Sequence, residues 1–322
     1  MNRRALAAAA AALALTGCAG GNYPDTPLPA PSGSSSSSTT AAPPVTCDDP
    51  TQSYDSLGSI PSAGAIDDAG MSEIVSRGRL IVGVSGDSYL LGARNPISNK
   101  IEGFDIDIAK QVAKALFGDE NKITLRVISA ADREKLLQSG EIDMVARNMT
   151  MTCDRWTRIA FSSEYYHAGQ KLLVTLGAYD ADPTQGLADQ KDKRVCAPTG
   201  TTSLAKLKTV AGVEAVTAGN HTGCLVLFQQ GKADAITGDD TVLAGLAAQD
   251  PYAKVTDAPA ISDEPYGLGI NAKNTYFVRY VNAVLDQIRA DGTWQEIYDK
   301  WLAGALGKAP NPPRPVYGRP LP

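Results

Sequence analysis

The amino-acid sequence predicts an α/β fold made of two units that enclose a ligand between them. Two stretches, 80–146 and 194–239, each alternate short apolar strands with helices, an order typical of parallel sheets covered by helices. The composition allows such a core, since 43% of the 322 residues are hydrophobic.

The first unit begins with Leu80–Val84, an apolar run typical of a strand that is covered on both faces. Asp105 is a plausible N-cap, because apolar residues recur at helical spacing from Ile108 to Phe117. Further strands are expected at 123–128 and 142–146, with a helix at 131–137 between them.

The second unit follows the same pattern. Strands are expected at 195–197 and 235–237, and a helix begins at Thr202. Two helices follow near the end of the chain, separated by Gly292. Residues 309–322 are rich in proline, and we expect them to lie outside the core.

The N-terminus predicts export. Arg3 and Arg4 precede an apolar run that is too short to span a membrane, so residues 1–17 are predicted to be a signal peptide. The run ends in Leu-Thr-Gly-Cys18, which resembles the lipobox of bacterial lipoproteins and implies a lipid on Cys18. An ordinary cleaved signal with an incidental Cys18 is the alternative. Residues 18–70 are predicted to form a largely disordered tether, on the Pro, Ser and Thr content of 19–46. The expected location is the extracytoplasmic face of the cell membrane.

Composition excludes several classes of function. The net charge of −5 argues against nucleic acid as a partner. His167 and His221 have no Cys or His at metal-ligand spacing, so neither a metal nor another cofactor is expected. Ser203–Lys206 fits a serine-x-x-lysine pattern, but its partner motifs Ser-Asp-Asn and Lys-Thr-Gly are missing from the sequence. The sequence therefore predicts a protein that is not an enzyme.

Four cysteines remain if Cys18 carries a lipid, and they allow three pairings in an oxidising compartment. We prefer Cys196 with Cys224 within one unit, and Cys47 with Cys153 joining the N-terminal segment to the other.

Several motifs resemble one known family. Gly103-Phe104-Asp105-Ile106-Asp107 resembles the signature of family 3 extracellular solute-binding proteins, which bind polar amino acids for ABC transporters. Further similar segments follow in the family's order: Met149–Thr152 with Arg155, Gly200–Thr202, Gly231–Asp239, Glu264–Gly267 and Asp291–Trp301. Together they cover roughly residues 80–302.

The resemblance implies a type II periplasmic-binding-protein fold, with two α/β lobes joined by two hinge-crossing strands. Lobe 1 would comprise 71–169 and 268–306, lobe 2 would comprise 170–267, and 307–322 would form a C-terminal tail. The expected crossing strands are Lys171–Thr175 and Tyr266–Ile270.

The resemblance also implies a ligand site. Burying a zwitterionic amino acid costs several kcal/mol per ion unless each charge finds a partner, so the site needs one cation and one anion. Arg155 matches the family's carboxylate-binding arginine, and Asp239 matches the acid that receives the ammonium. Because Asp240 follows directly, a shift by one position stays open. Thr150 and the backbone near Asn148 would add hydrogen bonds from lobe 1, and Gly200, Thr201 and Thr202 would open a helix whose free N–H groups favour the carboxylate.

Two departures from the family bear on the ligand. The family's stacking aromatic falls on Ser88, with Tyr89 one residue later, so either the loop differs or the ligand-binding ring is shifted to Tyr89. Leu91 stands in place of a nearby phenylalanine. Arg147 stands where small residues are common, so it could meet a second carboxylate on the ligand. We therefore expect glutamate or aspartate, then glutamine or asparagine. The alternative is that Arg147 points outward and pairs with a surface acid.

The expected function is that of a monomeric substrate-binding lipoprotein that delivers an amino acid to an ABC permease. Two alternatives stay open. One is an extracytoplasmic sensor that reports to a membrane kinase, and the other is a dehydratase-like enzyme on the same fold.

Overall fold

The computed structural model describes residues 45–322. The predicted signal peptide 1–17, the lipid site at Cys18 and the tether up to residue 44 lie outside this range. Within 45–322, no helix combines the length and the apolar character that a membrane span requires.

The first lobe is built on a sheet of five strands in the order β5-β1-β6-β14-β7. β1 pairs in parallel with β5 and β6, whereas β14 runs antiparallel to β6 and β7. These strands are β1 (Leu80–Val84), β5 (Ile123–Val127), β6 (Met144–Ala146), β7 (Ile159–Phe161) and β14 (Gly269–Asn271). A smaller antiparallel sheet contains β2 (Asp87–Ser88), β3 (Gly92–Arg94) and β4 (Ile101–Glu102). The lobe therefore combines both ends of the described chain.

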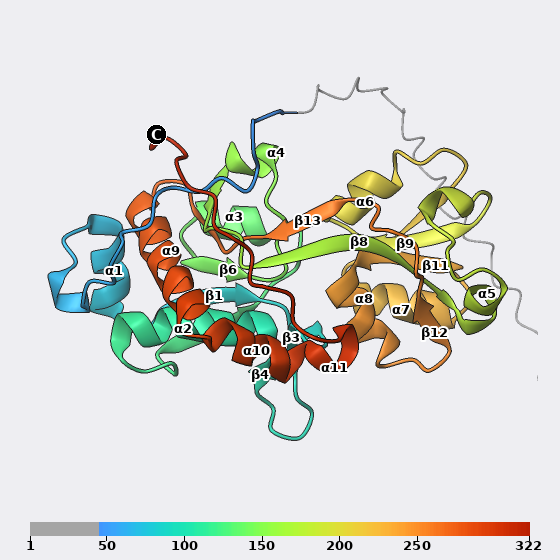
Figure 1. Ribbon diagram of the computed structural model, residues 1–322, viewed down its shortest axis with the longest axis horizontal. Helices are drawn as coiled ribbons and strands as arrows, with labels where there is room; N and C mark the ends of the chain where they lie inside the picture. Colours follow the sequence, from blue (N-terminus) through green and yellow to red (C-terminus); the bar gives the residue numbers. More distant parts are fainter. Residues whose placement is uncertain (1–44) are drawn as a thin grey trace, which may run out of the picture. The chain divides into compact units, whose positions relative to one another are not determined.

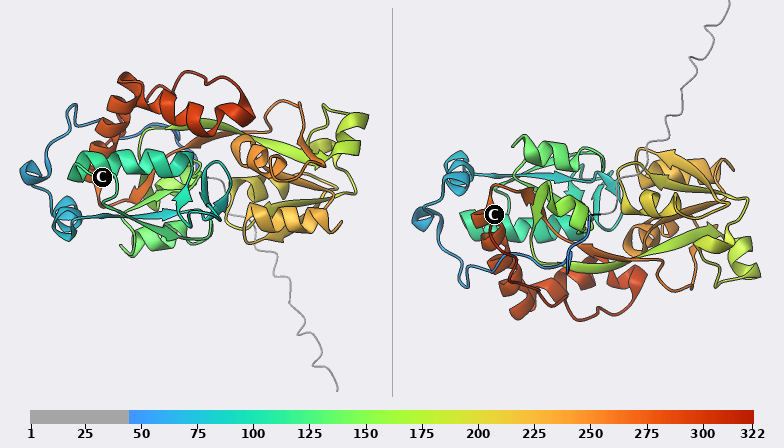
Figure 2. Two further views of the ribbon diagram at one scale, coloured as in Figure 1. Left: turned by 90° about the horizontal axis from the view of Figure 1, so that it is seen from below. Right: turned by 90° about the horizontal axis from the view of Figure 1, so that it is seen from above.

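Helices α2, α9 and α10 contact one another (Figure 2). Their buried side chains form a large apolar cluster with those of the sheet. The helical segments of this lobe are η1 (Ala63–Ala65), α1 (Ala69–Arg77), α2 (Phe104–Phe117), α3 (Arg133–Gln138), α4 (Cys153–Trp156), α9 (Thr275–Ala290), α10 (Thr293–Trp301) and α11 (Ala303–Leu306).

The start of α2 corrects one expectation. The N-cap is Gly103, at φ 145°, and Asp105 is the second residue of the helix. A Cβ at Gly103 would lie 2.3 Å from the backbone of Leu91, so only glycine fits there. The Asp105 carboxylate instead accepts hydrogen bonds from the Asn148 N–H (2.8 Å) and the Tyr165 hydroxyl (2.8 Å). Its role is to fix the loop after β6.

The second lobe contains a sheet in the order β10-β9-β11-β8-β12. Its strands are β8 (Tyr166–Thr175), β9 (Arg194–Pro198), β10 (Glu214–Ala218), β11 (Ala235–Asp239) and β12 (Ala253–Val255). Its helical segments are α5 (Leu176–Ala181), η2 (Leu187–Asp189), α6 (Thr202–Leu207), α7 (His221–Gln229) and α8 (Asp240–Ala247). A fully buried disulfide between Cys196 and Cys224 ties α7 to β9.

The two lobes are joined where β8 pairs antiparallel with β13 (Asp263–Tyr266), as Figure 1 shows. The register runs from Gly169 opposite Asp263 to Tyr166 opposite Tyr266. The crossing segment of β8 thus lies before the expected Lys171–Thr175, which belongs to the sheet of lobe 2. On the return strand the crossing ends at Tyr266, and the chain continues into β14 of lobe 1. The resemblance implied a crossing strand at 171–175, but β8 is one ten-residue strand that serves both the crossing and the sheet.

Both terminal segments pack on lobe 1, which differs from the expected tether and free tail. Gln52 and Val316 form a parallel bridge, Ser53 and Tyr54 are buried, and the Arg319 guanidinium lies 3.8 Å from the centre of the Trp156 ring. The Cys47–Cys153 disulfide fixes the same segment to α4. Composition did not reveal that Tyr54 joins the apolar core of lobe 1, or that Leu57, Ile60 and Ile66 pack against that core.

Candidate ligand-binding site

One small cavity between the lobes brings together five of the seven predicted ligand-binding residues. Lobe 1 contributes Arg147, Asn148 and Thr150, and lobe 2 contributes Thr202 and Asp239. The space among them is only about 10 Å³, roughly that of one water molecule. An amino acid can therefore enter only if the lobes separate about the crossing strands.

The loop after β6 carries the lobe 1 side of the cavity. Asn148 has a φ of 35°, and its N–H is held by the buried Asp105 carboxylate. Burial raises the pKa of Asp105 to about 6, while hydrogen bonds from Tyr165 and Asn148 act in the opposite direction. The next residues place Thr150 opposite Tyr266 in an isolated antiparallel bridge. Thr150 is therefore held against the crossing strand, whereas Asn148 is held by Asp105 within lobe 1.

Arg155 lies in α4, directly behind this loop, and only 7% of it is exposed. Its Nη1 donates to the Thr150 carbonyl oxygen (2.6 Å), its Nη2 lies 3.4 Å from the Gly200 carbonyl oxygen of lobe 2, and its Nε lies 3.5 Å from Glu134. Burial lowers the pKa of Arg155, and the carboxylates of Glu134, Glu264 and Asp239 offset part of this effect. A buried guanidinium thus stands where the two lobes meet.

Asp239 ends β11 on the opposite side and is 4% exposed. The Tyr266 hydroxyl donates to its Oδ2 at 2.6 Å. Burial raises the pKa of Asp239 to about 7, and the neighbouring Glu264 carboxylate raises it as well. Of the two adjacent acids, Asp239 lines the cavity, whereas Asp240 begins α8 and accepts from the Thr241 N–H (2.6 Å).

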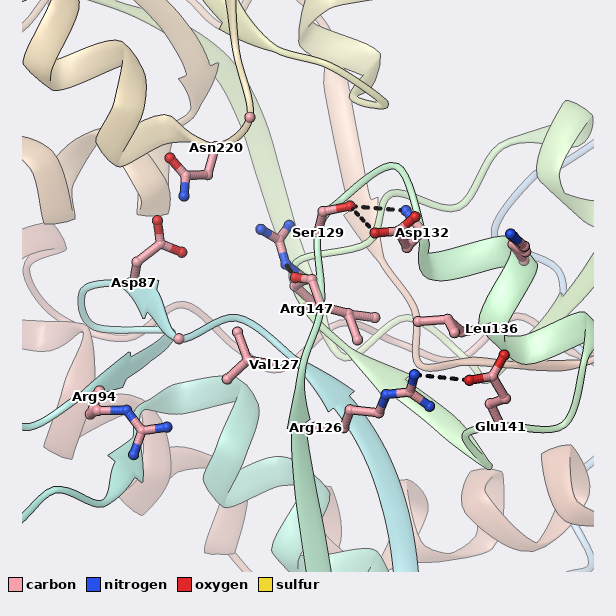
Figure 3. Close-up of a pocket in the computed structure, with 14 residues that line it drawn as sticks. Asp87, Arg94, Arg126, Val127, Ser129, Asp132, Leu136, Glu141, Arg147 and Asn220 are labelled. Carbon is pink, nitrogen blue, oxygen red and sulfur yellow. Dashed lines mark hydrogen bonds and ion pairs between the residues drawn. The ribbon is translucent and has the colours of Figure 1, made fainter.

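Arg147 faces inward. It is 6% exposed, its Nε donates to the Ile128 carbonyl oxygen (3.0 Å), and its side chain lines both the small cavity and an outer cleft of about 830 Å³. Figure 3 shows this cleft, with Asp87 and Arg147 of lobe 1 near Asn220 of lobe 2. The alternative of an outward arginine paired with a surface acid is therefore wrong.

Tyr89 lies outside the cavity, and 47% of it is exposed. The chain turns at Leu90 (φ 74°), so that Leu91 enters the core of lobe 1 while Tyr89 does not. The Tyr89 carbonyl oxygen instead lies against α8, 2.5 Å from the position that a Cβ on Gly245 would take. The expected shift of the family's aromatic to Tyr89 is not what the structure has.

Sequence reasoning missed two buried charged residues of the site. Arg133 is 3% exposed and donates to the carbonyl oxygens of Arg147 (3.1 Å) and Gly200 (3.0 Å). Its place at the start of a polar helix gave no signal of burial. Glu264, also 3% exposed, accepts from the hydroxyls of Thr150 and Thr202 at 2.6 Å each. Glu264 begins the segment Glu264–Gly267 that resembles the family, and this resemblance was the one sequence signal for its role.

Within residues 45–322, no group of His, Cys, Asp and Glu side chains is arranged to hold a metal ion. The buried groups of the site are instead arginines and carboxylates supplied by different lobes.

Residues 80–304 match the family described as bacterial extracellular solute-binding proteins, family 3. This match spans more than half of the chain. The chain belongs to this family. It is therefore a solute-binding protein and not an enzyme, as the motifs implied.

Curated members of the family support this assignment. The chain is 35% identical over 233 residues to the ABC transporter glutamine-binding protein GlnH of Bacillus subtilis, a match that covers 72% of this chain and 84% of that protein. It is 40% identical over 206 residues to the glutamine-binding protein of Geobacillus stearothermophilus (64% and 77% covered). The glutamate-binding protein GluB of Corynebacterium efficiens is 32% identical over 250 residues (74% and 82% covered).

Solved structures of the family agree with the fold. An ancestral arginine-binding protein bound to glutamine has a TM-score of 0.65 at 32% identity, covering 72% of this chain and 99% of that one. An arginine-binding protein mutant from T. maritima has a TM-score of 0.67 at 27% identity (73% and 99% covered). The type II fold predicted from the sequence is thereby confirmed.

Proposed function

We propose that the chain captures an acidic or amide amino acid between its lobes and delivers it to the permease of an ABC importer. The observation that carries this proposal is the pair of buried, oppositely charged groups, Arg155 on lobe 1 and Asp239 on lobe 2. Family members of similar sequence are glutamine- and glutamate-binding proteins, which supports the same ligand class.

The proposed clamp works because each lobe supplies one half of it. Arg155 would bind the ligand carboxylate, since a guanidinium can hold both oxygens of a carboxylate. Asp239 would bind the ammonium, together with Thr150, Thr202 and the backbone near Asn148. Closing the lobes then forms both ion pairs at once, so that binding and the change of shape are coupled.

The side-chain end of the ligand would face Arg147. Its guanidinium lies in a region that also contains Asp87 and the buried ring of His221. Burial lowers the pKa of His221 to about 4, and the charge of Arg147 acts in the same direction, so the ring is neutral at pH 7. One fixed cation favours a ligand carboxylate or amide oxygen and disfavours lysine and arginine.

The remaining proposals concern the setting. Lipid attachment at Cys18 would hold a monomeric protein at the extracytoplasmic face of the membrane, within reach of a permease. The segment 18–44 would be the tether, and the lobes would divide at 169/170 and 267/268.

The test of ligand class is the melting temperature of the purified chain with each of the twenty amino acids. A ligand at one hundred times its Kd stabilises the folded state by about 2.7 kcal/mol. We expect shifts with glutamate, aspartate, glutamine or asparagine only. A shift confined to lysine or arginine contradicts the ligand class, and no shift with any amino acid contradicts the clamp.

The test of transport is uptake of the amino acid that binds, in cells with and without the gene. Loss of uptake that returns with the wild-type gene supports an importer. Normal uptake in the deletion strain, with a binding-competent protein, contradicts it.

A further inference from the structure

One carboxylate oxygen in the hinge accepts hydrogen bonds from both lobes. Glu264 lies on β13, opposite Ala168 of β8, and its Oε2 accepts from Thr150 of lobe 1 and Thr202 of lobe 2, each at 2.6 Å. Its other oxygen, Oε1, accepts from the Ser262 hydroxyl at 2.7 Å. Lengths near 2.6 Å are typical of hydroxyls that donate to an ionised carboxylate.

These bonds fix which way the two threonine hydroxyls point. A hydroxyl has one proton to donate and two lone pairs that accept. Because Thr150 and Thr202 each donate to Glu264, neither has a proton left for a second partner. Thr150 and Thr202 also line the small cavity. They therefore offer only lone pairs to whatever the lobes enclose.

Asp239 lines the same cavity, and its carboxylate accepts a hydrogen bond from the Tyr266 hydroxyl. An ammonium group has three N–H donors and no acceptor. Two threonine oxygens and one carboxylate match that pattern, whereas they have no proton to offer a ligand hydroxyl or carboxylate.

We propose that Glu264 is a positioning residue: it accepts the hydroxyl protons of Thr150 and Thr202, so that the two oxygens can only accept and this part of the cavity is selective for an ammonium group. This inference rests on the proposed function, because it assumes an amino acid ligand. It adds a residue that touches no ligand, since Glu264 lies behind the two threonines rather than on the cavity wall.

The location of Glu264 also ties this selectivity to closure. Thr150 and Thr202 belong to different lobes, and their oxygens lie 3.3 Å apart only because the lobes meet. Separating the lobes removes at least one threonine from Glu264. The complete set of acceptors thus exists only in the closed arrangement.

The experiment compares binding of an amino acid with binding of its desamino counterpart. Full-length chain is titrated calorimetrically with L-glutamate and glutarate, and with L-glutamine and glutaramate. The quantity of interest is the Kd of the desamino compound divided by the Kd of its amino acid, because a general loss of folded structure changes both Kd values alike.

Two substitutions of Glu264 separate hydroxyl orientation from charge. Glu264→Met removes the acceptor, and we expect the ratio to fall about tenfold or more, since a charge-assisted hydrogen bond network is lost. Glu264→Gln keeps an oxygen at the Oε2 position, with its amide N–H₂ facing the Ser262 oxygen. We expect this variant to keep most of the selectivity. Asp263→Asn, on the neighbouring and largely exposed side chain, should change nothing.

A second pair of variants does not depend on Glu264. Thr202→Val removes one acceptor at the start of α6, whereas Thr202→Ser keeps it. We expect the Kd ratio to fall for valine and to persist for serine, even if Glu264→Met does not fold.

Three results would overturn the inference. In the first, Glu264→Met, or Thr202→Val if the former does not fold, weakens both members of a pair by the same factor. In the second, Glu264→Gln loses the ratio as fully as Glu264→Met, which would mean that charge alone matters. In the third, the wild type binds neither amino acid, and the proposed function fails together with the inference. Amino acid binding with unchanged ratios in the variants removes only the inference.

Discussion

Arg133 of the first lobe donates to the carbonyl oxygen of Gly200 in the second lobe across 3.0 Å. The backbones of Gly200 and Ala131 also approach closely there. A Cβ built on Gly200 would lie 2.7 Å from the Ala131 Cα and 2.8 Å from its N, and the φ of Gly200 is 75°. The closed arrangement therefore requires glycine at this position, both for its φ and for the contact.

We expect Gly200→Ala to fold but to bind its amino acid at least tenfold more weakly. The added methyl group prevents the last step of closure, and a ligand held by only one lobe loses half of its ionic partners. Calorimetric titration measures the loss, and small-angle scattering with saturating ligand shows whether the lobes still close.

The matched control is Gly231→Ala. Gly231 also has a positive φ, of 65°, but a Cβ there would meet nothing within 4 Å. This variant carries the backbone strain without the contact between lobes. If both variants bind equally weakly, strain rather than closure explains the effect.

Removal of Arg155 should weaken binding far more than removal of a nearby arginine. Truncating one partner of a buried charge pair costs about 2–5 kcal/mol, so Arg155→Ala should raise Kd by roughly 30-fold to several thousand-fold. Arg155→Lys should recover only part, because an ammonium cannot hold both carboxylate oxygens.

Arg158 gives the comparison for this prediction. It pairs with Glu134 and Asp154 at the surface, with 38% of its side chain exposed. Arg158→Ala should leave Kd within about threefold, since exposed ion pairs contribute little. An Arg155→Ala protein that binds as well as Arg158→Ala would contradict the assignment of the carboxylate to Arg155.

The motifs predicted one half of the site better than the other. Asp239 and Thr150 fall in segments whose order matched a family, and both line the cavity. Arg133 and Glu264 instead contact groups of both lobes: Arg133 donates to carbonyl oxygens of Arg147 and Gly200, and Glu264 accepts from the hydroxyls of Thr150 and Thr202. Most of these partners are distant in sequence, so hydrophobic periodicity gave no indication that the two charges are buried, and only the resemblance of Glu264–Gly267 to the family pointed to Glu264.

The elements of the fold also differ in how well the sequence predicted them. Leu80–Val84 was predicted with its correct limits, because a strand that is covered on both faces is apolar throughout. The crossing part of β8 contains the polar and small residues His167 and Gly169, and its partner strand is nearly 100 residues away. Such pairing depends on the arrangement of the two sheets, which hydrophobic periodicity does not encode.

Binding should release a proton near neutral pH. The pKa of Asp239 is about 7, because the carboxylate is buried and lies near Glu264. A bound ammonium favours the ionised form, so below pH 7 the ligand must displace a proton. Affinity should therefore rise by up to about tenfold per pH unit from pH 5 to 7 and then level off.

Calorimetry in buffers of different ionisation enthalpy measures the released proton directly. In Glu264→Gln the plateau should begin at lower pH, because one negative charge near Asp239 is gone. Asp239 should also lower the stability of the ligand-free fold as pH rises from 4 to 7, since its pKa is raised above the ordinary value of 3.8. A pH-independent affinity with no proton release would show that Asp239 does not receive the ammonium.

Loss of the Cys47–Cys153 disulfide should release the terminal segments without abolishing ligand binding. The bond spans 106 residues, and a loop of that length corresponds to on the order of 4 kcal/mol of stabilisation. The double variant Cys47→Ser with Cys153→Ser should melt at a lower temperature and show faster hydrogen exchange in residues 47–57 and 314–319. Arg155 should still bind the carboxylate, because its own contacts run to Thr150, Glu134 and Gly200. Unchanged exchange in both segments would mean that contacts such as Trp156 Nε1 with the Pro50 carbonyl oxygen (2.8 Å) hold them without the disulfide.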